Sequence, residues 1–231
     1  ESLDGWPRAV VDGLDEAAPR RGEAPYVVHV PMLDEARQQP NRLAYMLAHE
    51  AFHFCLNPWV EHPVVEVVAV AVALAMLDVV GERWDGPQAY VPRFAQYRAK
   101  VERDACDALG LDPAQDVPGL PPRVFPLDGP ERHAAFVTPH HVAAGAVVAR
   151  RVLDPHRRGW PALLDLTYER GVLSREDGTV DFDAWREAVQ LNARVWGGDI
   201  PLDEERAFVV SECVAVVRGV RDVLAGRFAS S

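Results

Sequence analysis

The chain has 231 residues, of which 48% are hydrophobic and 26% are charged, and its formal net charge at pH 7 is −11. This length and composition suffice for a sizeable hydrophobic core, in one domain or two small ones, and exclude a repeat protein and a disordered chain. The negative charge excludes a nucleic-acid partner, because such a partner requires a basic surface that neutralises phosphates.

The amino-terminal segment contains two short predicted elements. Residues 8–17 have the pattern of a short amphipathic helix. Residues 25–31 are the clearest strand of the chain, and the proline at each end is typical of an edge strand. We expect this strand to lie beside the helix that follows, where it either holds an extended peptide or only packs against that helix.

The motif HExxH, formed by His49, Glu50 and His53, lies within a predicted helix of residues 41–56. Residues four apart on a helix share a face, so the two histidines can bind one metal ion. Glu50, one position further round, would then lie beside a water that the metal activates. The motif therefore predicts a metal site with His49 and His53 as ligands and Glu50 as the general base.

A third ligand is predicted in the next helix. Residues 63–77 are apolar apart from Glu66, and a helix that is apolar on all sides is buried. An ionised carboxylate on such a helix is costly unless it is paired or binds a metal, which favours Glu66 as the ligand. Glu61 and His62 precede this helix in a connection where solvent can satisfy them, and they remain alternatives.

These residues resemble the gluzincin metallopeptidases, and in particular the compact enzymes of the ImmA/IrrE type. The resemblance covers residues 26–80 and rests on the HExxH motif, on Glu66-Val67-Val68-Ala69, and on the alanine-rich continuation of the second helix. It implies two histidine ligands, one glutamate ligand and a glutamate general base at a zinc ion. Phe52 stands where the family usually has a small residue.

The rest of the chain is expected to be helical. Residues 1–111 form the predicted zincin-like metal-site region, residues 112–130 a connector rich in proline and glycine, and residues 131–231 a helical region packed on the first as one compact unit. Helices are predicted over residues 91–109, 138–152, 161–170, 183–196 and 201–224. The predicted class is therefore mainly α with a small β element, that is, α+β.

The apolar run of residues 64–80 is at the lower limit of a membrane span and contains Glu66, so a buried helix of a soluble fold is expected instead. The three cysteines, Cys55, Cys106 and Cys213, are too few and too widely spaced for a disulfide framework. They fit a reducing compartment, and the expected location is the cytoplasm. Cys55 is expected to pack in the core.

The expected function is zinc-dependent hydrolysis of a peptide amide bond, with a peptide or protein as substrate and partner. Two alternatives stay open. Two histidines and a carboxylate also suit Fe²⁺ and oxygen chemistry, which would make the chain a hydroxylase or another tailoring enzyme. The chain could also be a non-catalytic binding protein on the same fold, although the intact Glu50 argues against it.

Peptide hydrolysis also requires a donor that stabilises negative charge on the attacked carbonyl. The carboxy-terminal half offers four equal candidates for it: His133, His140, His141 and Tyr168. The sequence favours none of them, and it gives no indication of the oligomeric state.

Overall fold

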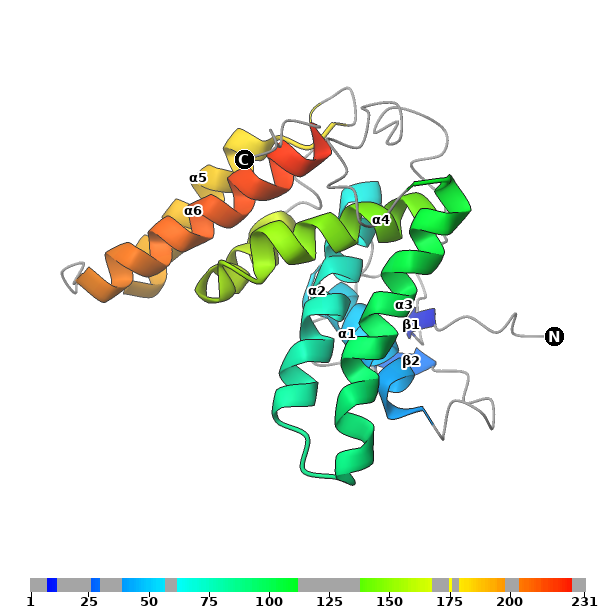
Figure 1. The fold of residues 1–231 in the computed structure, drawn as a ribbon. Helices are drawn as coiled ribbons and strands as arrows, with labels where there is room; N and C mark the ends of the chain where they lie inside the picture. Colours follow the sequence, from blue (N-terminus) through cyan, green and yellow to red (C-terminus); the bar gives the residue numbers. More distant parts are fainter. Residues whose placement is uncertain are drawn as a thin grey trace.

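A computed structural model of the chain describes residues 8–11, 26–29, 39–56, 62–111, 138–167, 175, 179–197 and 204–225. The elements in chain order are β1 (Arg8–Val11), β2 (Tyr26–His29), α1 (Pro40–Cys55), α2 (Pro63–Glu82), the 3₁₀ helix η2 (Gln88–Tyr90), α3 (Val91–Leu109), α4 (Pro139–Val148), the π-helix η5 (Ala149–Leu153), the 3₁₀ helix η6 (Arg157–Thr167), α5 (Phe182–Gly197) and α6 (Glu204–Leu224) (Figure 1). The mainly helical class predicted from the sequence is confirmed.

Helix α2 is the centre of the fold. It contacts α1, α3, α4 and η5, and nearly all of its side chains between Pro63 and Leu77 are buried, as the apolar sequence predicts. Each fully buried valine or leucine contributes about 1.5–3 kcal/mol relative to an exposed one. By length and composition α2 is the one helix among the described residues that could cross a membrane, and most of that stretch is buried inside the protein.

Helix α4 approaches α2 closely at a glycine. A Cβ atom added to Gly145 would lie 2.5 Å from Cγ1 of Val70 and 2.9 Å from the carbonyl oxygen of Val67. The two backbones can meet at this distance because Gly145 has no side chain. The contact fixes how the amino-terminal turns of the two helices lie relative to each other.

Arg98 of α3 holds three carboxylates in a partly buried ion cluster. It pairs with Asp78 of α2 and with Asp154, which follows η5, at 2.9 Å from Nη2 to Oδ2. It also pairs with Glu102 one turn along its own helix, at 3.2 Å from Nε to Oε1. The cluster ties α3 to α2 and to the segment that leaves η5.

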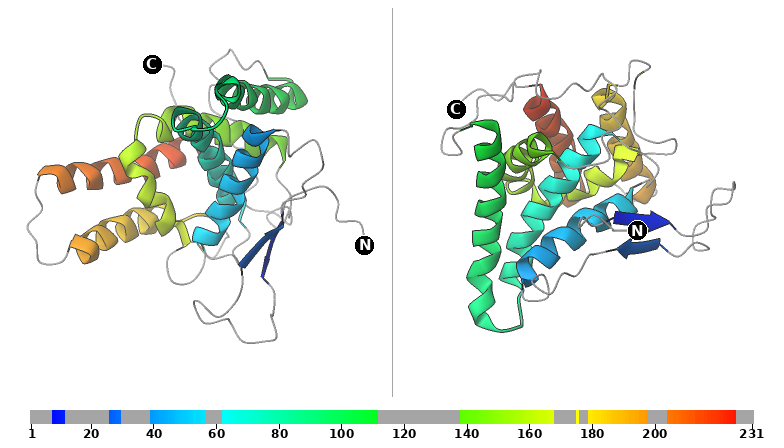
Figure 2. Two further views of the ribbon diagram at one scale, coloured as in Figure 1. Left: turned by 90° about the horizontal axis from the view of Figure 1, so that it is seen from below. Right: turned by 90° about the vertical axis from the view of Figure 1, so that its right-hand side faces the viewer.

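The carboxy-terminal helices α5 and α6 pack against each other and against η6, on the side of the molecule away from β1 and β2 (Figures 1 and 2). Trp185 of α5 is fully buried, and its indole Nε1–H donates to the carbonyl oxygen of Ala162 at 2.9 Å. Nδ1 of His156, in the turn between η5 and η6, lies 2.8 Å from Oε2 of Glu212 and links this turn to α6. The predicted connector of residues 112–130 lies outside the described residues.

Three sequence-based expectations about secondary structure need correction. The helix expected over residues 8–17 is wrong at Arg8–Val11, which form β1 and pair antiparallel with β2, because two β-branched valines suit a paired strand. The helix expected through residue 152 is α-helical to Val148 and then continues as a π-helix. The helix expected from Pro161 begins at Arg157 as a 3₁₀ helix. Within this helix Pro161 has no backbone N–H to donate.

Candidate metal centre

Helix α1 presents the two histidines of the HExxH motif on one face, as their spacing predicts. His49 is buried, with 6% of its surface exposed, and the His53 side chain keeps 17%. Glu66 reaches the same place from the first turn of α2 with 25% of its side chain exposed. The His49 end of the cluster is therefore buried, and the Glu66 end is partly exposed to solvent.

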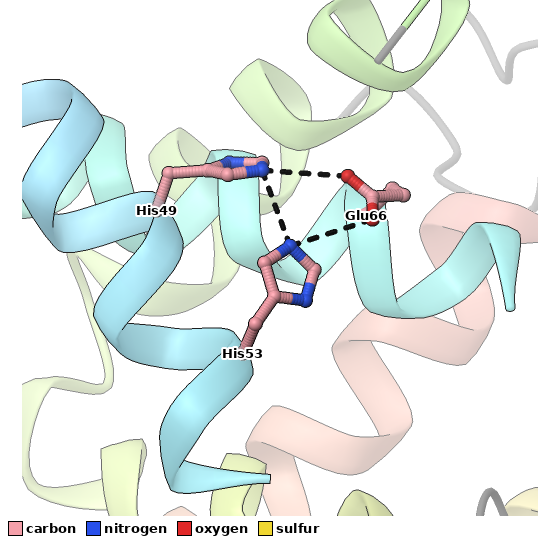
Figure 3. A group of neighbouring side chains, drawn as sticks. All are labelled: His49, His53 and Glu66. Atoms are coloured by element: carbon pink, nitrogen blue, oxygen red, sulfur yellow. Dashed lines mark hydrogen bonds and ion pairs between the residues drawn. The ribbon is translucent and has the colours of Figure 1, made fainter. Parts of the chain in front are cut away.

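The three side chains converge on one point (Figure 3). Nε2 of His49 and Nε2 of His53 are 3.2 Å apart, and each lies 3.4 Å from an oxygen of Glu66. A zinc ion bound tetrahedrally at 2.0–2.1 Å requires its ligand atoms to be about 3.3–3.4 Å from each other. The three donor atoms thus fit three corners of such a site, and no fourth metal-binding side chain joins them among the described residues.

Helix α2 begins in a way that assigns His62 another role. His62 is the N-cap of α2, and its Nδ1 accepts a hydrogen bond from the backbone N–H of Val64 at 3.2 Å. Among the described residues, the group that could hold a metal consists of His49, His53 and Glu66, and His62 is not part of it. Glu61, the other alternative, lies outside the described residues.

The close approach of these side chains shifts the pKa values of Glu66 and His53. Burial raises the pKa of Glu66, but hydrogen bonds from His49 and His53 and the charge on these rings outweigh burial, so the pKa lies well below its ordinary range. For His53 burial lowers the pKa, and the contact with Glu66 together with the charge of Glu50 raises it above its ordinary value. A metal would have to displace the proton that this environment holds on the ligand set.

Glu50 lies beside the cluster on α1. It is buried, with 6% of its surface exposed, and its charge acts on His53. The structure thus keeps the predicted general base next to the predicted ligands.

Tyr45 is a neighbour of the site that the sequence analysis did not identify. Its ring stacks on the His49 imidazole with centroids 6.4 Å apart and planes 25° apart, and it meets Tyr97 of α3 edge to face. Burial, then the neighbouring Tyr97 and Glu66, raise the pKa of Tyr45, so its hydroxyl stays protonated. Its position one turn before His49 was the available sequence signal.

One buried atom of the site has no hydrogen-bond partner among the described residues, Nδ1 of His49. A histidine that binds a metal through Nε2 carries its proton on Nδ1 and usually donates it to an acceptor. A described contact of the His49 ring is its stacking on Tyr45.

Of the four residues considered as donors to the attacked carbonyl, the structure brings His141 near the cluster. His141 is buried at the start of α4, and the charges of Glu66 and His49 both act on it. His140, its neighbour, is less buried. His133 and Tyr168 lie outside the described residues.

The cysteines take no part in this group. Cys106 and Cys213 are buried, whereas Cys55 is exposed, contrary to the expectation that it packs in the core. Cys55 is the last residue of α1.

Comparisons with protein-family models, with curated proteins and with solved structures found no match to this chain. Inferences about its chemistry therefore depend on the side chains that its own helices bring together.

Proposed function

We propose that the chain is a zinc-dependent hydrolase that cleaves a peptide amide bond, with His49, His53 and Glu66 as metal ligands and Glu50 as general base. The observation that carries the proposal is the triangle of donor atoms, whose sides of 3.2, 3.4 and 3.4 Å match those of a tetrahedral zinc site with one open position. Catalytic zinc sites with three protein ligands and an open position commonly contain this donor set.

When bound, zinc would supply a water with a pKa near ~7 and would polarise the carbonyl of the scissile bond. The Glu50 carboxylate takes a proton from the attacking water as the new C–O bond forms. It then gives the proton to the leaving nitrogen as the C–N bond breaks. Glu50 suits this work because it is buried beside the cluster and precedes His53 by less than one turn.

The proposal includes the finer elements of the expected fold and setting. The hairpin of β1 and β2 contacts α1, and it would be the small β element of an α+β, zincin-like fold. Resemblance to the gluzincins supports the ligand roles, and a peptide or protein is the proposed substrate. The spacing of the cysteines supports a cytoplasmic location.

The experiment combines metal analysis with a cleavage assay. Protein purified without added metal is analysed for zinc and iron, and wild type and Glu50→Gln are incubated with a peptide library at equal metal occupancy. About one zinc per chain, with cleavage by the wild type and none by Glu50→Gln, supports the proposal.

Two other results would contradict it. Iron in place of zinc, with oxygen consumption, would favour the hydroxylase alternative. Equal activity in the two proteins, or a bound metal with no cleavage by either, would favour a role that does not depend on Glu50.

A further inference from the structure

The first turn of α4 contains a capping box with an unusual member. Thr138 is the N-cap, and its side chain accepts a hydrogen bond from the backbone N–H of His141 at 3.4 Å. In return, Nδ1 of His141 accepts from the backbone N–H of Thr138 at 3.1 Å. The residue that reaches back in such a box is commonly Glu or Gln, whereas here it is an imidazole.

This box determines which ring nitrogen of His141 carries the proton. Because Nδ1 accepts from a backbone N–H, the neutral ring must hold its proton on Nε2. Burial lowers the pKa of His141; the Glu66 carboxylate opposes this in part, and His140 and His49 lower the pKa further. His141 is therefore a neutral ring with an N–H donor at the end opposite the capping box.

The packing of α4 on α2 places the first turn of α4 beside the first turn of α2. Gly145, one turn after His141, meets Val70, one turn after Glu66, at the closest approach of the two helices. Residues four apart share a helix face, so His141 and Glu66 lie on the faces that meet. The action of both Glu66 and His49 on His141 agrees with this placement.

We propose that the Nε2–H of His141 donates a hydrogen bond to a negatively charged oxygen held at the open position of the His49, His53 and Glu66 cluster. In peptide hydrolysis, which is the proposed function on which this inference rests, that oxygen comes from the attacked carbonyl. A donor that is already in place before the reaction stabilises developing charge without reorganisation. The capping box makes Thr138 a positioning residue for His141.

A test that does not require turnover uses Co²⁺ as the metal and acetohydroxamate as the probe. Acetohydroxamate presents a negatively charged oxygen at the open position of such sites, and the visible absorption of bound Co²⁺ reports both metal binding and probe binding. The variant is His141→Gln, because Gln at this helix position keeps the capping box. The matched control is His140→Gln, an identical change one residue earlier on α4.

We expect His141→Gln to weaken acetohydroxamate binding about 10-fold to 100-fold, since hydrogen bonds to charged groups have about this effect. Its Co²⁺ affinity and thermal unfolding should stay near those of the wild type, and His140→Gln should match the wild type in all three measurements. A second variant, His141→Glu, also keeps the box but replaces the donor by an acceptor. It should weaken acetohydroxamate at least as much, and it takes the place of His141→Gln if that variant does not fold.

The outcomes separate this inference from the proposed function. If Co²⁺ binds and both His141 variants bind acetohydroxamate as the wild type does, the inference is wrong and the metal site stands. A loss in Tyr45→Phe without a loss in the His141 variants would assign the donor to Tyr45 instead and overturn the inference equally. If the wild type binds no Co²⁺, the metal site itself is wrong and the inference falls with it.

Discussion

Gly145→Ala tests the close contact between α2 and α4, on which the proposed role of His141 depends. An alanine is the better helix former by about 1 kcal/mol, so an exposed helical site would gain stability from this change. At Gly145 the added Cβ would instead lie 2.5 Å from Cγ1 of Val70 and 2.9 Å from the carbonyl oxygen of Val67. Since the second atom belongs to backbone, the helices must separate, and such overpacking costs about 1–3 kcal/mol.

Taken with the gain in helix propensity, the expected net loss for Gly145→Ala is up to about 2 kcal/mol, which corresponds to a fall in Tm of up to roughly 4–8 °C for a chain of this size. The matched control is Gly81→Ala in α2, where the nearest atom to an added Cβ is Cβ of Phe94 at 3.4 Å, an ordinary contact. That change should be neutral or stabilising by up to about 1 kcal/mol. Thermal unfolding of both variants provides the test. If Gly145→Ala is as stable as Gly81→Ala, then α4 does not approach α2 as closely at Gly145 as described.

The remaining predictions concern the metal site. His49→Ala should abolish binding of about one zinc per chain, because two ligands hold zinc poorly, and full zinc content in this variant would remove the site. Glu66→Gln should weaken zinc binding strongly while Glu61→Gln leaves it near normal, measured by competition with a chelator; the reverse order would assign the third ligand to Glu61. Glu50→Gln should keep the metal and lower turnover of a cleaved peptide by ~10²-fold to 10⁴-fold, and unchanged turnover at equal occupancy would exclude Glu50 as the base.

The same cluster predicts how stability of the metal-free protein depends on pH. The pKa of His53 is raised, so its contribution is complete below its ordinary value of 6.5 and is lost as the pH rises through the folded value. The pKa of Glu66 is lowered, so its contribution is present above its ordinary value of 4.5 and is lost as the pH falls. Chelator-treated wild type should exceed Glu66→Gln in Tm most between these two values, and a constant difference from pH 4 to 9 would contradict the coupling.

The parts of the site that follow local rules could be predicted from the sequence. Helical spacing is enough to place His49 and His53 on one face, and the cost of burying a lone carboxylate singles out Glu66 in an apolar helix. The structure brings these three side chains together. The role of His62 as an N-cap was missed because a histidine before a proline is not a common capping signal.

The contribution of α4 could not be predicted in the same way. Whether His141 or another residue approaches the cluster depends on how α4 crosses α2, and that depends on a contact at Gly145 with residues 75 or more positions earlier in the chain. Likewise, β1 has only four residues, which is too few for hydrophobic periodicity to distinguish a strand from a helix. Its secondary structure depends on its pairing with β2, which is distant in sequence.

The π-helix η5 determines the angle, about the axis of α4, at which the chain leaves that helix. The backbone N–H of Asp154 donates to the carbonyl oxygen of Ala149, five residues earlier, at 2.9 Å, so this turn holds one residue more than an α-helical turn would. Removing a single residue here would restore a continuous α-helix and rotate everything after it by about 100° relative to α4. Val152 would lose its contact with Gly219 of α6, and Asp154 would swing away from Arg98. A one-residue deletion in η5 should therefore be far more damaging than a conservative substitution there, and natural length variation should fall elsewhere in the chain.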